Sequence, residues 1–366
     1  MSVAQRAPEY VRAISPYIPG KPISELAREM GLDEAMIVKL ASNENPLGMS
    51  PKARLAVETV MADLARYPDG SGFSLKRALA AKLGVAADTL VLGNGSNDLL
   101  DLAARAFLSV GTSSVFAQHA FAVYPIATQT VGARGIETPA KNFGHDLDAM
   151  LKGIATDTRV VFIANPNNPT GTFLPGAAIE SFLQRCPSDV IVVLDEAYNE
   201  YLAPEQRYDS IAWLKRFPNL LITRTFSKIY GLAGLRIGYG VAHPDVADLL
   251  NRVRAPFNAN SIALAAAEAA LNDEAFLSNS YAVNRAGMQQ LEKGLHALGL
   301  ETIASSGNFI TVKVGDAVGI NQRLLRRGVI VRPIGGYGMP QWLRVSIGLE
   351  NENARFLEAL AAALKD

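Results

Sequence analysis

A lysine follows a short apolar run, among residues that are suited to bind an anion. The run 220–223 is followed by Thr225, Ser227 and Lys228, and Arg236 comes eight residues after the lysine. Hydroxyls and a guanidinium bind phosphate through charge-assisted hydrogen bonds. A lysine whose pKa is lowered by burial and nearby positive charge can form an imine with an aldehyde. A surface lysine in a flexible loop is the ordinary alternative.

An acidic residue, Asp195, follows the apolar run 190–194, and Tyr198 comes three residues later. A carboxylate at the end of a buried strand is costly unless a cation faces it. A protonated pyridine nitrogen is such a cation, and the tyrosine could reach an oxygen on the same ring. A glycosidase-like pair with Glu196 is disfavoured, because adjacent residues of an extended chain point to opposite faces. An acid paired at the sheet edge is the simpler alternative.

Two further apolar runs end in polar turns. The run 160–164 leads into 165–171, where the amide of Asn168 can donate to a ring oxygen. A rigid proline turn with capping asparagines is the alternative there. The strand 89–92 leads through Gly93-Asn94-Gly95 into Ser96 and Asn97, where a helix begins. A helix N-terminus offers free N–H groups and a positive dipole end to a phosphate, although a glycine-rich turn can also be purely structural.

The four turns together supply a phosphate cradle, a donor to a ring oxygen, an acid for a pyridinium and a lysine for an imine. These are the groups that pyridoxal 5'-phosphate requires. Because ligands of open α/β sheets bind beyond the carboxyl ends of the strands, we expect the four turns to meet at one sheet edge. The sequence therefore predicts a pyridoxal-phosphate site.

Strand and helix patterns alternate between residues 73 and 242, which is typical of a three-layer α/β domain with a mostly parallel sheet. The apolar runs given above have few polar positions, as strands buried on both faces do. The predicted helices of this region are 73–83, ending at Gly84, 97–107, 177–184 and 211–217.

The two ends of the chain have different patterns from the middle. Residues 1–45 predict an arm with one short helix at 23–30, expected to pack on the small domain and on a dimer partner. Residues 46–258 form the predicted large cofactor-binding domain, and 259–366 a smaller α+β domain. Its expected helices are 260–271, 274–298, 321–327 and 351–364, and its expected strands are 309–312, 329–331 and 343–347.

The composition is that of an ordinary globular protein. Of 366 residues, 49% are hydrophobic and 19% charged, enough apolar residues for a sizeable core. Lys+Arg and Asp+Glu both number 35, so no basic excess suggests nucleic acid or an anionic membrane as a partner. No signal-peptide pattern and a single cysteine, Cys186, favour the cytoplasm. The four histidines are scattered, without a metal-ligand spacing.

Over nearly its whole length the chain resembles the fold-type I aminotransferases, and within them the histidinol-phosphate aminotransferases. Seven segments carry this resemblance. They are Leu40-Ala41-Ser42-Asn43-Glu44-Asn45-Pro46, Arg66-Tyr67-Pro68-Asp69, Gly93-Asn94-Gly95-Ser96, Asn168-Pro169-Thr170-Gly171, Asp195-Glu196-Ala197-Tyr198, Ser227-Lys228 and Gly231-Leu232-Ala233-Gly234-Leu235-Arg236.

The resemblance implies a role for each matching residue. Lys228 would bind the cofactor's aldehyde and later move a proton, Asp195 would pair with the pyridine nitrogen, and Asn168 and Tyr198 would bond the phenolic oxygen. Phe121 would stack on the ring. The phosphate would contact Ser96, Asn97, Thr225, Ser227, Arg236 and, from the neighbouring subunit, Tyr67, so a homodimer is expected. On the substrate side, Arg344 would grip the donor's carboxylate, beside Tyr17, Asn43 and Arg332.

The implied reaction moves an amino group between a small-molecule amino donor and a 2-oxo acid, with glutamate and imidazole acetol phosphate as the pair. This is the histidinol-phosphate:2-oxoglutarate reaction of histidine biosynthesis. Two departures leave the substrate open: Asn97-Asp98 replaces an acidic pair, and the segment 119–124 lacks the usual proline, with Phe121 where tyrosine is common. An aromatic aminotransferase or a decarboxylase of a phosphorylated amino acid are the alternatives.

A nicotinamide-dependent dehydrogenase is the remote alternative. It would use the Gly93-Asn94-Gly95 turn for a dinucleotide, but the third glycine of that motif and the acid that binds a ribose are missing. It would also leave Lys228 without a role.

Overall fold

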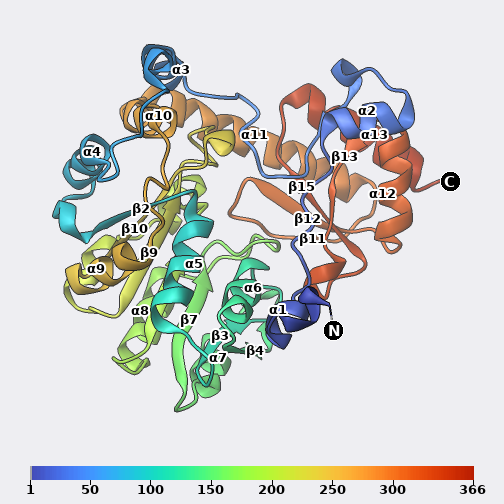
Figure 1. Ribbon diagram of the computed structural model, residues 1–366. Coiled ribbons are helices and arrows are strands. Elements are labelled where there is room, and N and C mark those ends of the chain that lie inside the picture. Colours follow the sequence, from blue (N-terminus) through green and yellow to red (C-terminus); the bar gives the residue numbers. More distant parts are fainter. Residues whose placement is uncertain (1) are drawn as a thin grey trace.

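The computed structural model describes residues 2–366, and a seven-stranded sheet forms the centre of its larger part (Figure 1). The strand order is β2-β10-β9-β8-β7-β3-β4. All neighbours are parallel except β10, which runs antiparallel to β2 and β9. The mostly parallel sheet that the sequence predicts is therefore confirmed. Its strands are β2 (Leu90–Gly93), β3 (Ser113–Ala117), β4 (Arg134–Thr138), β7 (Thr158–Ala164), β8 (Ile191–Asp195), β9 (Leu220–Thr225) and β10 (Gly238–Ala242).

Alternating residues of the central strands fill two apolar layers, one on each face of the sheet. In β7, Val160 and Phe162 belong to one cluster, and Val161 and Ile163 belong to the other. The first layer contains α5 (Ser96–Phe107), α6 (Val123–Thr130) and α9 (Pro244–Val253); the second contains α7 (Leu147–Gly153) and α8 (Gly176–Arg185). Burial on both faces explains why these strands read as continuous apolar runs.

A third group of helices covers the β2 edge. Helix α10 (Ser261–Leu271) packs on α3 (Pro51–Val60) and α4 (Phe73–Leu83), and its buried alanines share a cluster with β2 and β10. Helix α4 has the predicted bounds, and Gly84 ends it in the left-handed conformation. Helix α3 is absent from the sequence-based prediction.

The C-terminal part forms a smaller body, drawn in orange and red (Figure 1). Its antiparallel sheet has the order β11-β12-β15-β14. The strands are β11 (Thr302–Ile303), β12 (Phe309–Lys313), β14 (Arg332–Pro333) and β15 (Trp342–Ser346). They pack with α11 (Glu274–Ala297), α12 (Ala317–Arg326) and α13 (Glu350–Ala363).

The N-terminal segment contacts both bodies. Helix α1 (Glu9–Arg12) lies on α6, whereas α2 (Ile23–Met30) packs on Leu325 and Ile330 of the smaller body. Strand β1 (Val38–Lys39) pairs in parallel with β13 (Val329–Ile330). The remaining short elements are β5 (Ala140–Lys141), β6 (Gly144–His145) and the 3₁₀ turns Val3–Arg6, Glu34–Met36, Met61–Asp63, Ala87–Thr89, Asn199–Tyr201, Pro204–Gln206, Ile211–Lys215, Ala233–Leu235 and Gly335–Tyr337.

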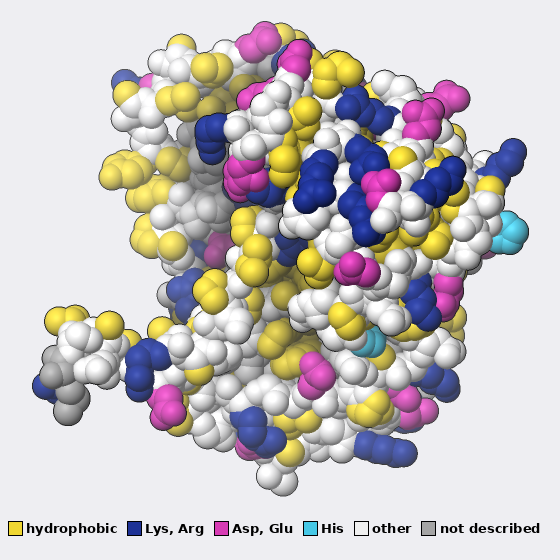
Figure 2. All heavy atoms as spheres, turned by 90° about the vertical axis from the view of Figure 1, so that its right-hand side faces the viewer, with side chains coloured by type: hydrophobic (Ala, Val, Ile, Leu, Met, Phe, Trp, Pro, Cys, Tyr) yellow, Lys and Arg dark blue, Asp and Glu magenta, His cyan; other side chains and the backbone are white. Residues whose placement is uncertain are grey.

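The side of the molecule that carries α12 and the C terminus has basic and acidic side chains interspersed (Figure 2). One such pair joins Arg327 to Asp366 at 2.6 Å. Among residues 2–366 no helix combines the length and the apolar character that crossing a membrane requires.

Candidate active site

One cavity at the carboxyl ends of the parallel strands brings together the residues that follow β2, β7, β8 and β9. The N-terminal segment and strands β14 and β15 of the smaller body close its other side. Of the predicted site residues, only Tyr67 lies elsewhere. Those that line the cavity are Tyr17, Asn43, Ser96, Asn97, Phe121, Asn168, Asp195, Tyr198, Thr225, Ser227, Lys228, Arg236, Arg332 and Arg344.

Lys228 lies three residues beyond the end of β9 and is half-buried in this cavity. Its Nζ donates to the carbonyl of Ser42 at 3.3 Å and lies 5.6 Å from the centre of the Tyr198 ring. Burial, and then the positive charges of Arg344 and Arg236, lower the pKa of Lys228 to about 7. Near neutral pH a large share of this amine is therefore uncharged and nucleophilic.

Asp195 is the last residue of β8 and is buried. It accepts hydrogen bonds from the hydroxyls of Tyr124, at 2.9 Å, and Thr223, at 3.1 Å. Burial raises the pKa of Asp195 to about 6, although these hydrogen bonds act in the opposite direction. Both partners are neutral, so the carboxylate can still be stabilised by a cation in the cavity.

Glu196 lies on the opposite side of the chain from Asp195, as the strand geometry predicts. Its carboxylate is fully buried and pairs with Arg224 at 2.8 Å, and it also accepts from the hydroxyl of Ser210 at 3.0 Å. The two neighbouring acids therefore do not form a catalytic pair.

Tyr124 is a cavity residue that the sequence analysis missed. It belongs to α6, where its ring stacks on Phe162 with centroids 4.8 Å apart, and its hydroxyl bonds to Asp195. Burial and the charge of Asp195 raise its pKa, so it stays a hydrogen-bond donor. Its spacing of three residues from Phe121 could have indicated that Tyr124 faces the cavity, but the helix that contains it was not predicted.

The first turn of α5 forms an anion cradle. Gly95 precedes the helix with φ +81°, and a Cβ there would lie 2.4 Å from Nη2 of Arg236. A Cβ on Gly238 would lie 2.5 Å from the backbone nitrogen of Ser96. Arg236 Nη1 donates to the Ser227 hydroxyl at 3.2 Å. The close approach of a guanidinium, a hydroxyl and helix N–H groups suits a phosphate.

Arg344 joins the smaller body to the strand ends of the larger one. It is buried and donates to Oδ1 of Asn168 and to the carbonyl of Ala41, both at 2.6 Å. Its Nε is buried and has no hydrogen-bond partner among the described residues. Beside it, Asn43 donates to the hydroxyl of Tyr198 at 3.0 Å, and burial raises the pKa of Tyr198 to about 12.

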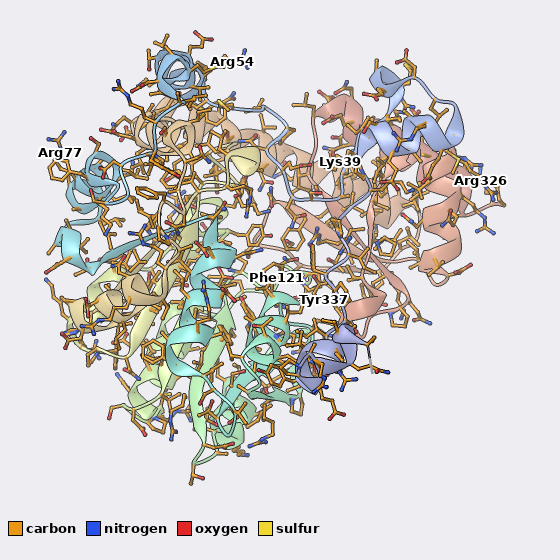
Figure 3. The ribbon with its side chains drawn as sticks, viewed as in Figure 1. Lys39, Arg54, Arg77, Phe121, Arg326 and Tyr337 are labelled. Atoms are coloured by element: carbon orange, nitrogen blue, oxygen red, sulfur yellow. The ribbon has the colours of Figure 1, made fainter. Side chains whose placement is uncertain are left out.

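The mouth of the cavity lies where the two bodies meet. The guanidinium of Arg332 stands 5.4 Å from the centre of the Tyr17 ring. Figure 3 labels Phe121, which precedes α6, and Tyr337 of the smaller body. The ring of His119 bonds through Nδ1 to the carbonyl of Tyr337 at 2.6 Å. His119 therefore connects the turn before α6 to the smaller body, a contact that its position in a loop does not predict.

Tyr67 lies on the surface, where 83% of the residue is exposed, and its ring stacks on Phe257 with centroids 4.8 Å apart. Its predicted contact with a neighbouring subunit cannot occur within one chain. No group of three or more metal-binding side chains occurs in the described part of the chain, residues 2–366.

Comparisons with known proteins agree with this arrangement. Residues 35–360 match the family described as aminotransferase class I and II. The chain is 66% identical over 361 residues to histidinol-phosphate aminotransferase 1 of Thiobacillus denitrificans, covering 99% of this chain and 94% of that protein. It is 63% identical over 364 residues to histidinol-phosphate aminotransferase 1 of Dechloromonas aromatica, covering 100% of both.

Solved structures show the same fold. The histidinol-phosphate aminotransferase of Sinorhizobium meliloti, in complex with pyridoxal-5'-phosphate, matches with a TM-score of 0.91 and 28% identity, covering 98% of each chain. A double mutant of Thermus thermophilus aspartate aminotransferase matches with a TM-score of 0.83 and 23% identity, covering 97% of this chain and 99% of that one. With the family matched from residue 35 to residue 360 and a lysine, an acid and an anion cradle gathered at one sheet edge, the chain belongs to the class I and II aminotransferases.

Proposed function

We propose that this aminotransferase uses pyridoxal 5'-phosphate to move an amino group between glutamate and imidazole acetol phosphate, which is the histidinol-phosphate:2-oxoglutarate reaction. The observation that carries the proposal is the common cavity of Lys228 and Asp195, with an anion cradle beside them. The names of the relatives from Thiobacillus denitrificans and Dechloromonas aromatica support the substrate, and the ligand of the Sinorhizobium meliloti structure supports the cofactor.

The chemical groups that line the cavity match those that this cofactor requires. The buried carboxylate of Asp195 has only neutral partners and suits a protonated ring nitrogen. The glycine positions of the cradle admit no Cβ, and its donors match a phosphate. We assign the phosphate to Ser96, Asn97, Thr225, Ser227 and Arg236, the phenolic oxygen to Asn168 and Tyr198, and the ring face to Phe121.

When bound, the cofactor supplies an aldehyde and a pyridinium ring that withdraws electrons from the substrate. The chain's own groups do the remaining work. Lys228 Nζ, with a pKa of about 7, can accept a proton from the substrate Cα at neutral pH and release it again. With the cofactor bound, the carboxylate of Asp195 would keep the ring nitrogen protonated.

Arg344 is the proposed anchor for the donor's carboxylate, because its guanidinium lines the cavity beside Asn168. Tyr17, Asn43 and Arg332 line the substrate side of the same cavity. Phe121, which lacks the hydroxyl of the tyrosine common at this position, leaves aromatic amino acids as a second candidate. A decarboxylase of a phosphorylated amino acid would use the same cofactor groups.

A panel of amino acids tests the substrate. Each is added to the yellow holoenzyme, and conversion of the bound cofactor to its amine form is followed by absorbance. Histidinol phosphate and glutamate should convert it, and the Lys228→Ala variant should show neither the visible absorbance nor turnover. Conversion by phenylalanine but not by histidinol phosphate would move the assignment to aromatic substrates.

We also propose a cytoplasmic homodimer in which Tyr67 reaches the partner's phosphate. The proposed division is an arm, 1–45, a large domain, 46–258, and a small domain, 259–366. The pairing of β1 with β13 supports packing of the arm on the small domain. Helix α10, which this division places in the small domain, packs on α3 and α4 of the large one, so it does not support the boundary at residue 258.

A further inference from the structure

The segment 254–258 belongs to the connection from α9 to α10 and contacts both sides of the anion cradle. Asn258 Nδ2 donates to Oδ2 of Asp98 at 2.7 Å and to the carbonyl of Leu92 at 3.1 Å. Leu92 precedes the glycine turn in β2, and Asp98 follows it in α5. Asn258 therefore links the two ends of the turn that begins α5.

Asp98 shapes this turn. The oxygen that accepts from Asn258 also accepts from the backbone N–H of Asn94 at 2.9 Å. The negative charge of Asp98 repels an anion nearby, so this carboxylate does not contribute to the cradle by attracting phosphate. Its contribution is the geometry of the turn, in which Gly95 donates to the carbonyl of Gly93 at 2.8 Å.

Arg254 supplies the cation that balances Asp98. Its Nη1 donates to Oδ1 of Asn258 at 2.7 Å, and its pKa is lowered by burial while Asp98 acts in the opposite direction. A guanidinium only donates and a carboxylate only accepts, so the orientation of the Asn258 amide is determined by its partners. Asn258 thus connects a cation to an anion.

The same segment holds the loop that carries Tyr67. Arg254 Nη2 donates to the carbonyl of Gly70 at 2.9 Å. The ring of Phe257 stacks on Tyr67 at an interplanar angle of 20°, and a Cβ on Gly70 would lie 3.3 Å from that ring. The hydrogen bond from Arg254 and the stacking of Phe257 therefore both position the loop that carries Tyr67.

We propose that Asn258 is a positioning residue that joins the phosphate-binding turn of a subunit to the Tyr67 loop that the subunit offers its partner. Asn258, Arg254 and Asp98 do not line the cavity, so they act through the residues they hold. The inference rests on the proposed cofactor site and dimer. It follows that one substitution at position 258 weakens cofactor binding without removing a contact to the cofactor.

The test measures the dissociation constant of pyridoxal 5'-phosphate by titrating the apoenzyme. Asn258→Asp places two carboxylates against each other and should weaken binding about tenfold, the usual effect of losing a hydrogen bond to a charged group. The double variant Asp98→Asn/Asn258→Asp again pairs one amide with one carboxylate, but it leaves the Leu92 carbonyl without its donor, so it should regain only part of the affinity. Asn251→Asp on α9, whose amide donates only to the carbonyl of Ala247 at 2.9 Å, is the matched control and should bind like the wild type.

Thermal unfolding of each apoenzyme shows whether a variant is folded at the temperature of the titration. If Asn258 acts by positioning, Asn258→Asp should bind the cofactor more weakly while its folded fraction equals that of the wild type. Should that variant not fold, the exchanged pair decides: recovery of folding with part of the affinity supports the inference, and a folded double variant that binds no cofactor contradicts it. Unchanged affinity in Asn258→Asp also contradicts it. A wild-type apoenzyme that binds no pyridoxal phosphate would instead overturn the proposed function.

Discussion

At the scale of the residue, the chemistry depends on two groups whose pKa values are displaced toward neutrality by burial. The pKa of Lys228 falls to about 7 and that of Asp195 rises to about 6. Both shifts reduce the charge that each group carries in the apoenzyme, and a cationic ring with an aldehyde would give both groups favourable partners. The electrostatics of the cavity therefore favour the proposed ligand.

The raised pKa of Asp195 has a consequence for stability. Its unfolded value is 3.8 and its folded value about 6, so the folded apoenzyme binds the proton more tightly and loses stability as the pH rises through that interval. Asp195→Asn has no such titration. Between pH 4 and pH 7.5 the wild-type apoenzyme should lose on the order of 2 kcal/mol relative to this variant. Denaturant unfolding at both pH values measures the difference. The raised pKa of Asp195 would be contradicted if the unfolding free energy of the variant, relative to the wild type, were no greater at pH 7.5 than at pH 4.

That residues at the strand ends share one site could be predicted from sequence, because parallel strands bring their carboxyl ends to one edge of the sheet. Lys228, Asp195 and Asn168 were found in this way, and all line one cavity. Tyr124 could not be found so, because its role depends on the direction of a helix, α6, that no strong periodicity indicates. The burial of the Arg344 Nε depends on packing between distant strands.

At the scale of the element, the turn between β2 and α5 controls the phosphate site. Ala at position 95 would adopt φ +81° and place its Cβ 2.4 Å from Arg236. Gly95→Ala should weaken pyridoxal-phosphate binding about 10- to 100-fold, as expected for the loss of a hydrogen bond to a charged group.

Gly299→Ala is the control for backbone strain. Gly299 has φ +72°, and a Cβ added there would have no other atom within 4 Å. Gly299→Ala should lose about 1 kcal/mol of unfolding free energy through backbone strain. Gly95→Ala should lose more, because φ +81° with ψ 169° is a conformation essentially restricted to glycine and the added Cβ meets Arg236, and only this variant should lose affinity. Equal cofactor affinities in the two variants would show that the cradle does not hold the phosphate.

Elements with one clear pattern were predicted well, and elements defined by tertiary pairing were not. Helix α4 has the predicted bounds and α5 begins one residue earlier than expected, whereas 211–217 forms only a 3₁₀ turn, Ile211–Lys215. Strand β10 was missed, since Gly238 and Gly240 weaken its pattern and its place depends on pairing with β2 and β9. Those glycines are needed because α5 lies against the strand: Cβ atoms there would approach Ser96 and Leu99 closely.

At the scale of the whole molecule, the site requires two bodies and, we propose, two subunits. Sequence predicted the mostly parallel sheet and the smaller α+β part, because both follow from the order of strands and helices. It could not show how Arg344 meets Asn168, a contact that joins positions 176 residues apart. The partner of Tyr67 depends on an interface that no single chain contains.

The proposed dimer predicts a mass in solution of about twice 39.1 kDa, measurable by analytical ultracentrifugation. Tyr67→Phe should keep that mass and weaken pyridoxal-phosphate binding by about tenfold, because only a hydroxyl contact to the partner's phosphate is lost. A monomer that binds the cofactor fully, or unchanged affinity in the variant, would contradict the assignment of Tyr67.

The proposed function depends above all on the amine of Lys228 meeting the cofactor's aldehyde opposite Asp195. Borohydride reduction of the holoenzyme, followed by digestion and mass spectrometry, tests it most directly by fixing the bond between the lysine nitrogen and the aldehyde carbon. We expect a phosphopyridoxyl group on Lys228 alone. A label on another lysine, or none on a yellow protein, would contradict it.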